Sequence, residues 1–76
     1  MAEPTVLDAK GLRCPLPVLK ARKAMKVLPL GATLRVLATD PGAIKDFEAF
    51  CKTTGYRLLS VSQGGDVLTF DIEKIE

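Results

Sequence analysis

The chain has 76 residues, of which 47% are hydrophobic and 26% are charged, and its formal net charge is +2. This length supports one domain with a single small core, and the composition is that of a globular chain. The net charge is too small to indicate nucleic-acid binding by itself, and no run of Lys and Arg is interleaved with aromatic residues. No apolar run approaches the roughly 20 residues that cross a bilayer. We therefore expect a single domain over residues 1–76, without direct nucleic-acid or membrane binding.

The cysteine and histidine content limits the kinds of active site that this chain can form. The first ten residues contain no long apolar stretch, so no secretory signal is expected and the protein is predicted to be cytoplasmic. In that compartment the two cysteines, Cys14 and Cys51, are expected to be free thiols. The chain has no histidine, which excludes a Cys–His nucleophile pair and a histidine base. A four-ligand zinc site cannot be built from one copy, so we expect no metal and no organic cofactor.

The first part of the chain is predicted to form a strand and an amphipathic helix. Residues 5–9 are rich in strand formers and are followed by a glycine loop. Residues 15–28 show a helical period, with basic side chains opposite the apolar ones, and residues 29–31 end the helix with Pro-Leu-Gly. The expected apolar face consists of Pro17, Val18, Ala21, Ala24, Met25 and Leu28.

The middle of the chain is predicted to form a second strand and a second helix. Apolar side chains alternate over residues 33–39, which is the pattern of a strand. Asp40 is expected to be the N-cap of the following helix and Pro41 its first residue. Gly55 is expected to end this helix in the left-handed conformation. The expected apolar face consists of Ala43, Ile44, Phe47, Phe50 and Cys51.

Two further strands are predicted, at residues 56–62 and 67–75, with a hairpin turn at residues 63–66. The Gly-Gly pair in that turn accepts the positive φ angles that tight hairpins require. The resulting βαβαββ order implies that the first two strands are parallel. Because the last strand is apolar on one face only, both helices are expected to cover the same side of the sheet. The predicted fold class is an α/β (α+β) two-layer sandwich.

Cys14 lies in the run Arg13-Cys14-Pro15-Leu16-Pro17, where the first helix is predicted to begin. A residue before proline avoids the helical region, so we expect Cys14 to be the N-cap and Pro15 the first helical residue. The positive end of the helix and the neighbouring Arg13 would favour the thiolate and lower its pKa. Pro15 and Pro17 have no N–H, which leaves the Leu16 N–H as the expected donor to the sulfur.

A single reactive thiol of this kind is typical of a sulfur carrier. Cys14 has no second cysteine two or three residues away, so it does not form a dithiol redox motif. A lone thiolate can hold a persulfide and pass its outer sulfur to another thiol. Two alternatives remain open: a redox-sensing or regulatory module in which Cys14 is oxidised, and an interaction domain in which Cys14 is inert.

The other candidate residues have a structural interpretation beside the functional one. Cys51 lies on the apolar face of the second helix, so we expect it to be a buried packing residue. Asp40 is explained as a helix cap. However, Asp40 and Cys14 both follow strands that are predicted to be parallel, so they could share one edge of the molecule as parts of a site.

A docking surface is predicted on the first helix. Leu16 and Leu19 fall outside its apolar face and lie close to Cys14, and the cations Arg22 and Lys23 follow them. A basic helix face is usually a solvated surface. Exposed apolar residues rimmed by cations beside a reactive thiol would also suit the binding of a partner protein.

The run from Leu7 to Pro17 resembles the L-D-x-x-G-x-x-C-P-x-P signature of the TusA/SirA-like sulfur carrier family. Asp40-Pro41 and the segment at residues 49–51 resemble two further family segments, and the similarity covers residues 6–73. The resemblance implies a single domain of this family with a mixed four-stranded sheet and two helices.

The resemblance also implies a role for Cys14 and for partner proteins. Cys14 matches the family's persulfide-bearing cysteine, the donor would be a cysteine desulfurase or a rhodanese-type sulfurtransferase, and the acceptor would be another protein. In different members the sulfur serves tRNA 2-thiouridine formation, sulfur oxidation or molybdenum-cofactor synthesis. Many members, including those of the tRNA pathway, have Glu between the two prolines, where this chain has Leu16. The docking surface beside the cysteine therefore differs from theirs.

Overall fold

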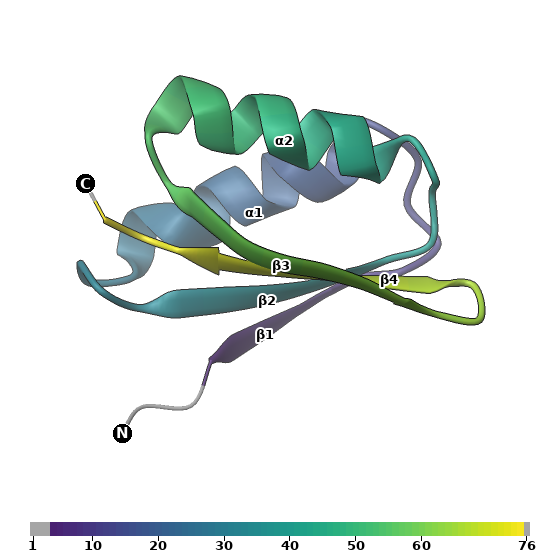
Figure 1. Cartoon of the computed structure of the whole chain (residues 1–76), viewed down its shortest axis with the longest axis horizontal. Helices are drawn as coiled ribbons and strands as arrows, with labels where there is room; N and C mark the ends of the chain where they lie inside the picture. The colour runs from purple at the N-terminus through teal and green to yellow at the C-terminus, as the bar shows by residue number, and fades with distance from the viewer. Residues whose placement is uncertain (1–3, 76) are drawn as a thin grey trace.

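The computed structural model describes residues 4–75 and shows two helices packed on one face of a four-stranded sheet (Figure 1). The elements in chain order are β1 (Thr5–Ala9), α1 (Leu16–Val27), β2 (Thr33–Ala38), α2 (Ala43–Thr54), β3 (Arg57–Gly64) and β4 (Val67–Glu73). The predicted βαβαββ order and the two-layer fold are confirmed.

The sheet is mixed, with the strand order β1-β2-β4-β3. β1 and β2 are parallel, because the connection between them crosses the sheet through α1. β4 is antiparallel to both β2 and β3 and lies between them. This central place explains why Leu68, Phe70 and Ile72 of β4 are all buried.

The core lies between the sheet and the helices. Phe47 of α2 stacks on Phe70 of β4 with ring centroids 4.5 Å apart, and Phe50 meets Phe47 edge-on. From α1, the buried side chains are Pro17, Ala21 and Met25. These positions lie on the two predicted apolar helix faces, so the helical periodicity was a correct guide to the core. The opposite face of the sheet carries polar side chains, including an ion pair between Arg35 and Asp71 at 2.8 Å.

The predicted start of α1 is wrong by one residue and that of α2 by two. Pro15, not Cys14, is the N-cap of α1, because its carbonyl accepts the first helical hydrogen bond, from the Leu19 N–H at 3.1 Å. Gly42, not Asp40, is the N-cap of α2 for the same reason, and its carbonyl accepts from the Asp46 N–H at 3.3 Å. Cys14 and Asp40 therefore lie in the loops that precede the helices.

The ends of the strands also differ from the prediction. β2 ends at Ala38 and β4 at Glu73, whereas β3 begins at Arg57 and runs to Gly64. The hairpin turn is shorter than expected, because Gly64 still pairs with Val67 in the ladder. Gly65 has a φ of 62° in this turn, and Gly55 ends α2 with a φ of 85°, which is the left-handed conformation predicted for it.

Candidate functional site

The loops that follow β1 and β2 lie side by side at one end of the molecule, on the right of Figure 1. Two hydrogen bonds join them. The Gly11 N–H donates to Oγ1 of Thr39 at 2.9 Å, and the Cys14 N–H donates to Oδ2 of Asp40 at 2.6 Å. The other carboxylate oxygen of Asp40 accepts from the Gly42 N–H at 2.9 Å. The structure thus brings Cys14 and Asp40 together at the edge where parallel strands end.

Asp46 completes the surroundings of the cysteine. The exposed Cys14 thiol donates a hydrogen bond to Oδ2 of Asp46, which lies in the first turn of α2. Our sequence interpretation missed this residue. Its position contained a usable signal, because Asp46 stands three residues after the buried Ala43 and four before the buried Phe50. The helical period therefore places an acidic side chain beside the packed face of α2, where α1 begins.

The thiol of Cys14 is harder to ionise than an ordinary cysteine. The hydrogen bond to Asp46 favours the neutral thiol, and desolvation and the charges of Asp46 and Asp40 act in the same direction, so the pKa is raised to about 11. The predicted lowering of this pKa is therefore wrong. The Leu16 N–H, expected to donate to the sulfur, donates instead to the carbonyl of Arg13 at 2.8 Å. Pro15 and Pro17 have no N–H, so the start of α1 has few hydrogen-bond donors that could stabilise a thiolate on Cys14.

The surroundings of Asp40 favour its charged form, whereas those of Cys14 favour the neutral thiol. The N–H groups of Cys14 and Gly42 both donate to it, and the positive charge of Arg13 acts in the same direction. Its pKa therefore lies below the ordinary value of an aspartate. Asp40 is thus an ionised group that fixes the backbone of the cysteine loop. The charge of Arg13 lowers the pKa of Asp40, and the negative charge of Asp40 in turn raises the pKa of Cys14.

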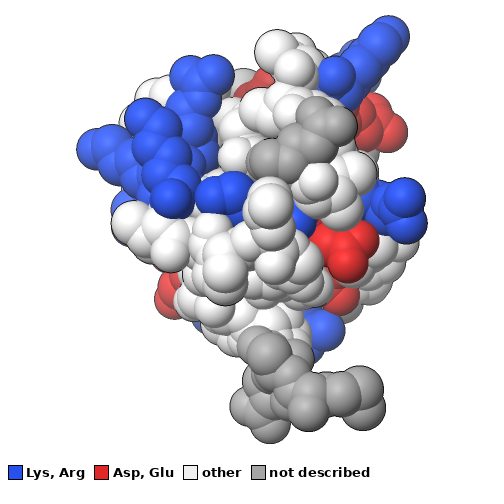
Figure 2. All heavy atoms as spheres, turned by 90° about the vertical axis from the view of Figure 1, so that its left-hand side faces the viewer, with Lys and Arg blue, Asp and Glu red and all other residues white. Residues whose placement is uncertain are grey.

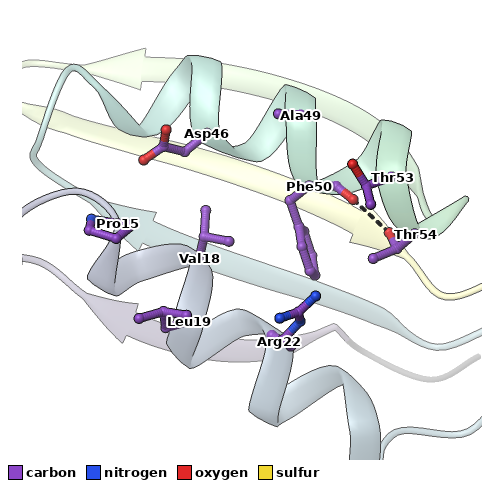
Figure 3. Close-up of a pocket in the computed structure, with 9 residues that line it drawn as sticks. All are labelled: Pro15, Val18, Leu19, Arg22, Asp46, Ala49, Phe50, Thr53 and Thr54. Carbon is purple, nitrogen blue, oxygen red and sulfur yellow. Dashed lines mark hydrogen bonds between the residues drawn. The ribbon is translucent and has the colours of Figure 1, made fainter.

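A groove of about 270 Å³ runs between α1 and α2 next to this site (Figure 3). Pro15 and Asp46 lie at one end of the groove, and the side chains of Arg22 and Phe50 point toward each other across its middle. The lining residues are Pro15, Val18, Leu19, Arg22, Asp46, Ala49, Phe50, Thr53 and Thr54. The groove therefore combines an apolar floor with one basic and one acidic side chain.

The predicted docking residues share a second hollow along α1. Leu16 and Leu19 are each 46% exposed. Together with Arg22 and Lys23 they line a hollow of about 340 Å³, which Lys20 and Lys26 extend. Lys and Arg side chains gather at the upper left of the face shown in Figure 2. The structure thus places all four residues on one continuous surface of the helix.

Cys51 lies in the core, as predicted. Its side chain is 6% exposed and packs among the buried residues of α2 and the sheet. Burial raises its pKa to about 11. Cys51 is therefore shielded from reagents, whereas Cys14 is exposed.

Residues 4–75 contain neither a helix that could span a membrane nor a cluster of metal-binding side chains. No helix in this part of the chain is long and apolar enough to cross a bilayer. The same residues contain no group of three or more His, Cys, Asp or Glu side chains placed to hold a metal ion.

The structure is therefore a two-layer α+β domain with an exposed cysteine in the loop before its first helix. The model of the family described as sulfurtransferase TusA matches residues 5–74. The chain belongs to this family.

Similar proteins agree with this assignment. The chain is 48% identical over 68 residues to the sulfur carrier protein TusA of Allochromatium vinosum, with 90% of each chain covered. It is 38% identical over 69 residues to the sulfur carrier protein TusA of Pseudomonas putida, with 91% of this chain and 86% of that one covered. A crystal structure of a SirA-like protein from Desulfitobacterium hafniense has the same fold, with a TM-score of 0.82, 24% identity, and 95% and 99% coverage. The names of the relatives support a sulfur-carrier role.

Proposed function

We propose that this protein accepts sulfane sulfur as a persulfide on Cys14 and passes it to a downstream protein. The observation that carries the proposal is the exposed, free thiol of Cys14 beside an open groove in a chain of the TusA family. A thiolate at this position can attack the outer sulfur of a donor persulfide and release the donor thiol. Cys51 cannot take this role because it is buried.

The proposed partners are proteins on both sides of the transfer. The donor is a cysteine desulfurase or a rhodanese-type sulfurtransferase, and the acceptor is a protein that uses the sulfur for tRNA 2-thiouridine formation, sulfur oxidation or molybdenum-cofactor synthesis. Both cysteines are free thiols in the structure, which suits a reducing compartment such as the cytoplasm.

Redox sensing by Cys14 is less well supported. Oxidation of a cysteine to a sulfenic acid follows its thiolate character. With a pKa raised to about 11, Cys14 has little thiolate at neutral pH. A bound protein donor holds its persulfide against Cys14 at a high effective concentration, which offsets the low fraction of thiolate. A dilute oxidant lacks this advantage and reacts slowly.

Mass spectrometry of the intact protein tests the proposed function. After incubation with a cysteine desulfurase and cysteine, the wild type should gain the mass of one sulfur atom and lose it on treatment with dithiothreitol. The reduction step is needed because two oxygen atoms have nearly the same mass as one sulfur, and a sulfinic acid is not reduced by dithiothreitol. Cys14→Ser should gain nothing, and Cys51→Ala should load normally. A gain of one oxygen only would support the redox-sensing alternative instead.

We also propose that Leu16, Leu19, Arg22 and Lys23 form the docking surface for the donor. The double substitution Arg22→Glu, Lys23→Glu reverses the charge beside the apolar pair and should slow loading from a protein donor roughly tenfold. Loading from glutathione persulfide should not change, because a small donor needs no docking surface. The matched control is Lys52→Glu, Arg57→Glu, two exposed cations in the last turn of α2 and at the start of β3. Equal loading of both double variants by the desulfurase would contradict this surface.

A further inference from the structure

The sulfur of Cys14 is in direct hydrogen-bond contact with one carboxylate, that of Asp46. The chain has no histidine that could move the proton of the thiol. The charged groups around the sulfur come from every neighbouring segment. Asp46 comes from α2, Asp40 from the loop after β2, and Arg13 precedes the cysteine in its own loop. Arg22 of α1 lines the groove that Asp46 also lines.

The two carboxylates have different contacts. Asp40 binds the backbone: its oxygens accept from the Cys14 N–H at 2.6 Å and from the Gly42 N–H at 2.9 Å. Asp46 binds the reacting atom itself, through the thiol proton. Asp40 therefore positions the loop, and Asp46 is the group placed to receive the proton.

We propose that Asp46 is a catalytic residue that takes the thiol proton of Cys14 and delivers it to the departing donor thiolate. This inference rests on the proposed function. In the loading step the Sγ–H bond of Cys14 breaks and its proton moves to the Asp46 carboxylate. The sulfur then attacks the outer sulfur of the donor persulfide, and a new S–S bond forms as the donor S–S bond breaks. The electron pair of that bond leaves on the donor thiolate, which takes the proton from Asp46, so persulfide plus thiol gives thiol plus persulfide.

The place of Asp46 at the groove supports the second half of this step. Figure 3 shows Asp46 at the same end of the groove as Pro15, the residue next to Cys14. A donor sulfur that reaches Cys14 along this groove would meet the Asp46 carboxyl beside the bond that breaks. An alkyl thiolate is strongly basic, so it leaves faster if it is protonated as the donor S–S bond breaks. An aromatic thiolate is weakly basic and leaves without a proton.

The test compares two sulfur–sulfur probes on Asp46→Asn. Glutathione persulfide has an alkyl thiolate as its leaving group, and 5,5′-dithiobis(2-nitrobenzoate) has an aromatic one. The matched control is Glu48→Gln, which removes an exposed carboxylate from the same helix. Asp46→Ser removes the carboxylate independently, and Asp46→Glu keeps a carboxylate in the same turn. Circular dichroism reports whether each variant is folded.

The proposal predicts opposite changes for the two probes. Without the Asp46 carboxylate the thiol ionises more readily, so attack on the aromatic disulfide should become roughly threefold faster for each tenfold gain in thiolate. Loading from glutathione persulfide should become roughly tenfold slower, because proton delivery is lost. Asp46→Ser should behave like Asp46→Asn, Asp46→Glu should recover part of the loading rate, and Glu48→Gln should match the wild type.

Acceleration of both reactions in Asp46→Asn and Asp46→Ser would overturn the proposal, because Asp46 would then only suppress ionisation. Unchanged loading in both variants would overturn it as well. A wild type that takes no sulfur from glutathione persulfide or from a desulfurase would overturn the proposed function, and the role of Asp46 with it. A wild type that loads normally while Asp46→Asn loads equally fast would overturn the role of Asp46 alone.

Discussion

At the level of single residues, the ionisation of Cys14 depends on which groups touch the sulfur. The start of a helix favours a thiolate when free N–H groups point at it. Here Pro15 and Pro17 have no N–H, and the Leu16 N–H is bonded to Arg13. The Asp46 carboxylate accepts the thiol proton directly. The contact with the carboxylate outweighs the weaker field of the helix, so the resting thiol is protonated.

Alkylation kinetics test this ionisation state. The pKa of folded Cys14 is about 11, above the ordinary cysteine value of 9.0, so its thiolate forms only as the pH rises toward 11. At pH 7 the folded protein should hold about a hundredth of the thiolate of an unfolded chain. Since a more basic thiolate is a better nucleophile, unfolding in urea should speed iodoacetamide modification of Cys14 roughly tenfold.

Cys51→Ala is the background for this measurement, so that only one thiol reacts. Faster alkylation of Cys14 in the folded state than in urea would contradict the raised pKa. In the wild type, Cys51 should react only after unfolding, since its thiol is buried in the core.

The residues of the site could be predicted only in part. Cys14 and Asp40 follow two parallel strands, and the rule for strand ends placed them together. The hydrogen bond from the Cys14 N–H to the Asp40 carboxylate could not be predicted from local patterns, because it joins positions 26 residues apart. Asp46 was missed because an acidic residue in the first turn of a helix has a sufficient local explanation in the helix dipole.

At the level of elements, the C-terminal end of α1 is stabilised from outside the helix. Nζ of Lys74 donates to the carbonyl of Met25 at 2.7 Å and to that of Leu28 at 2.8 Å. These carbonyls belong to the last turn and the C-cap of α1, where backbone acceptors lack the i+4 partner of a helix interior and cations are favoured. Lys74 therefore connects the end of the chain after β4 to α1.

Lys74→Met should lower the free energy of unfolding by about 1–2 kcal/mol, because two charge-assisted hydrogen bonds are lost. The midpoint of urea unfolding measures this change. Lys26→Met is the matched control, since Lys26 is exposed in the last turn of α1. Its loss should change the stability by less than about 0.5 kcal/mol. Equal effects of the two substitutions would contradict a capping role for Lys74.

The elements themselves were predictable, and so were the first residues of β1, β2 and β4, but the first residues of the two helices were not. Apolar residues at helical spacing located α1 and α2, and alternation located β2 and β4. The helix starts were wrong because a proline or an aspartate before a helix was interpreted by local capping rules. In the structure the Asp40 carboxylate accepts from the Cys14 N–H of the other loop and from the Gly42 N–H, and the carbonyl of Gly42 accepts the first helical hydrogen bond of α2.

At the level of the whole molecule, the strand order of the sheet determines where the candidate site lies. Since β1 and β2 are adjacent and parallel, their following loops meet at one edge and carry Cys14 and Asp40. Both helices lie on the same face, so α2 can bring Asp46 to the sulfur and leave a groove beside α1. The parallel pair of first strands followed from the order of elements in the sequence, whereas the strand order β1-β2-β4-β3 was not predicted. The groove was not predicted either, because it depends on how the side chains of two helices pack.

The central claim is that one sulfur atom is held on Cys14 in a transferable form, and cyanide tests it most directly. Cyanide removes the outer sulfur of a persulfide as thiocyanate and leaves the cysteine thiol. Protein loaded by a cysteine desulfurase and freed of small molecules should release about one thiocyanate per chain, with Cys51→Ala releasing the same amount and Cys14→Ser none. Release of thiocyanate from Cys14→Ser at the wild-type level, or no release from the loaded wild type, would contradict the account.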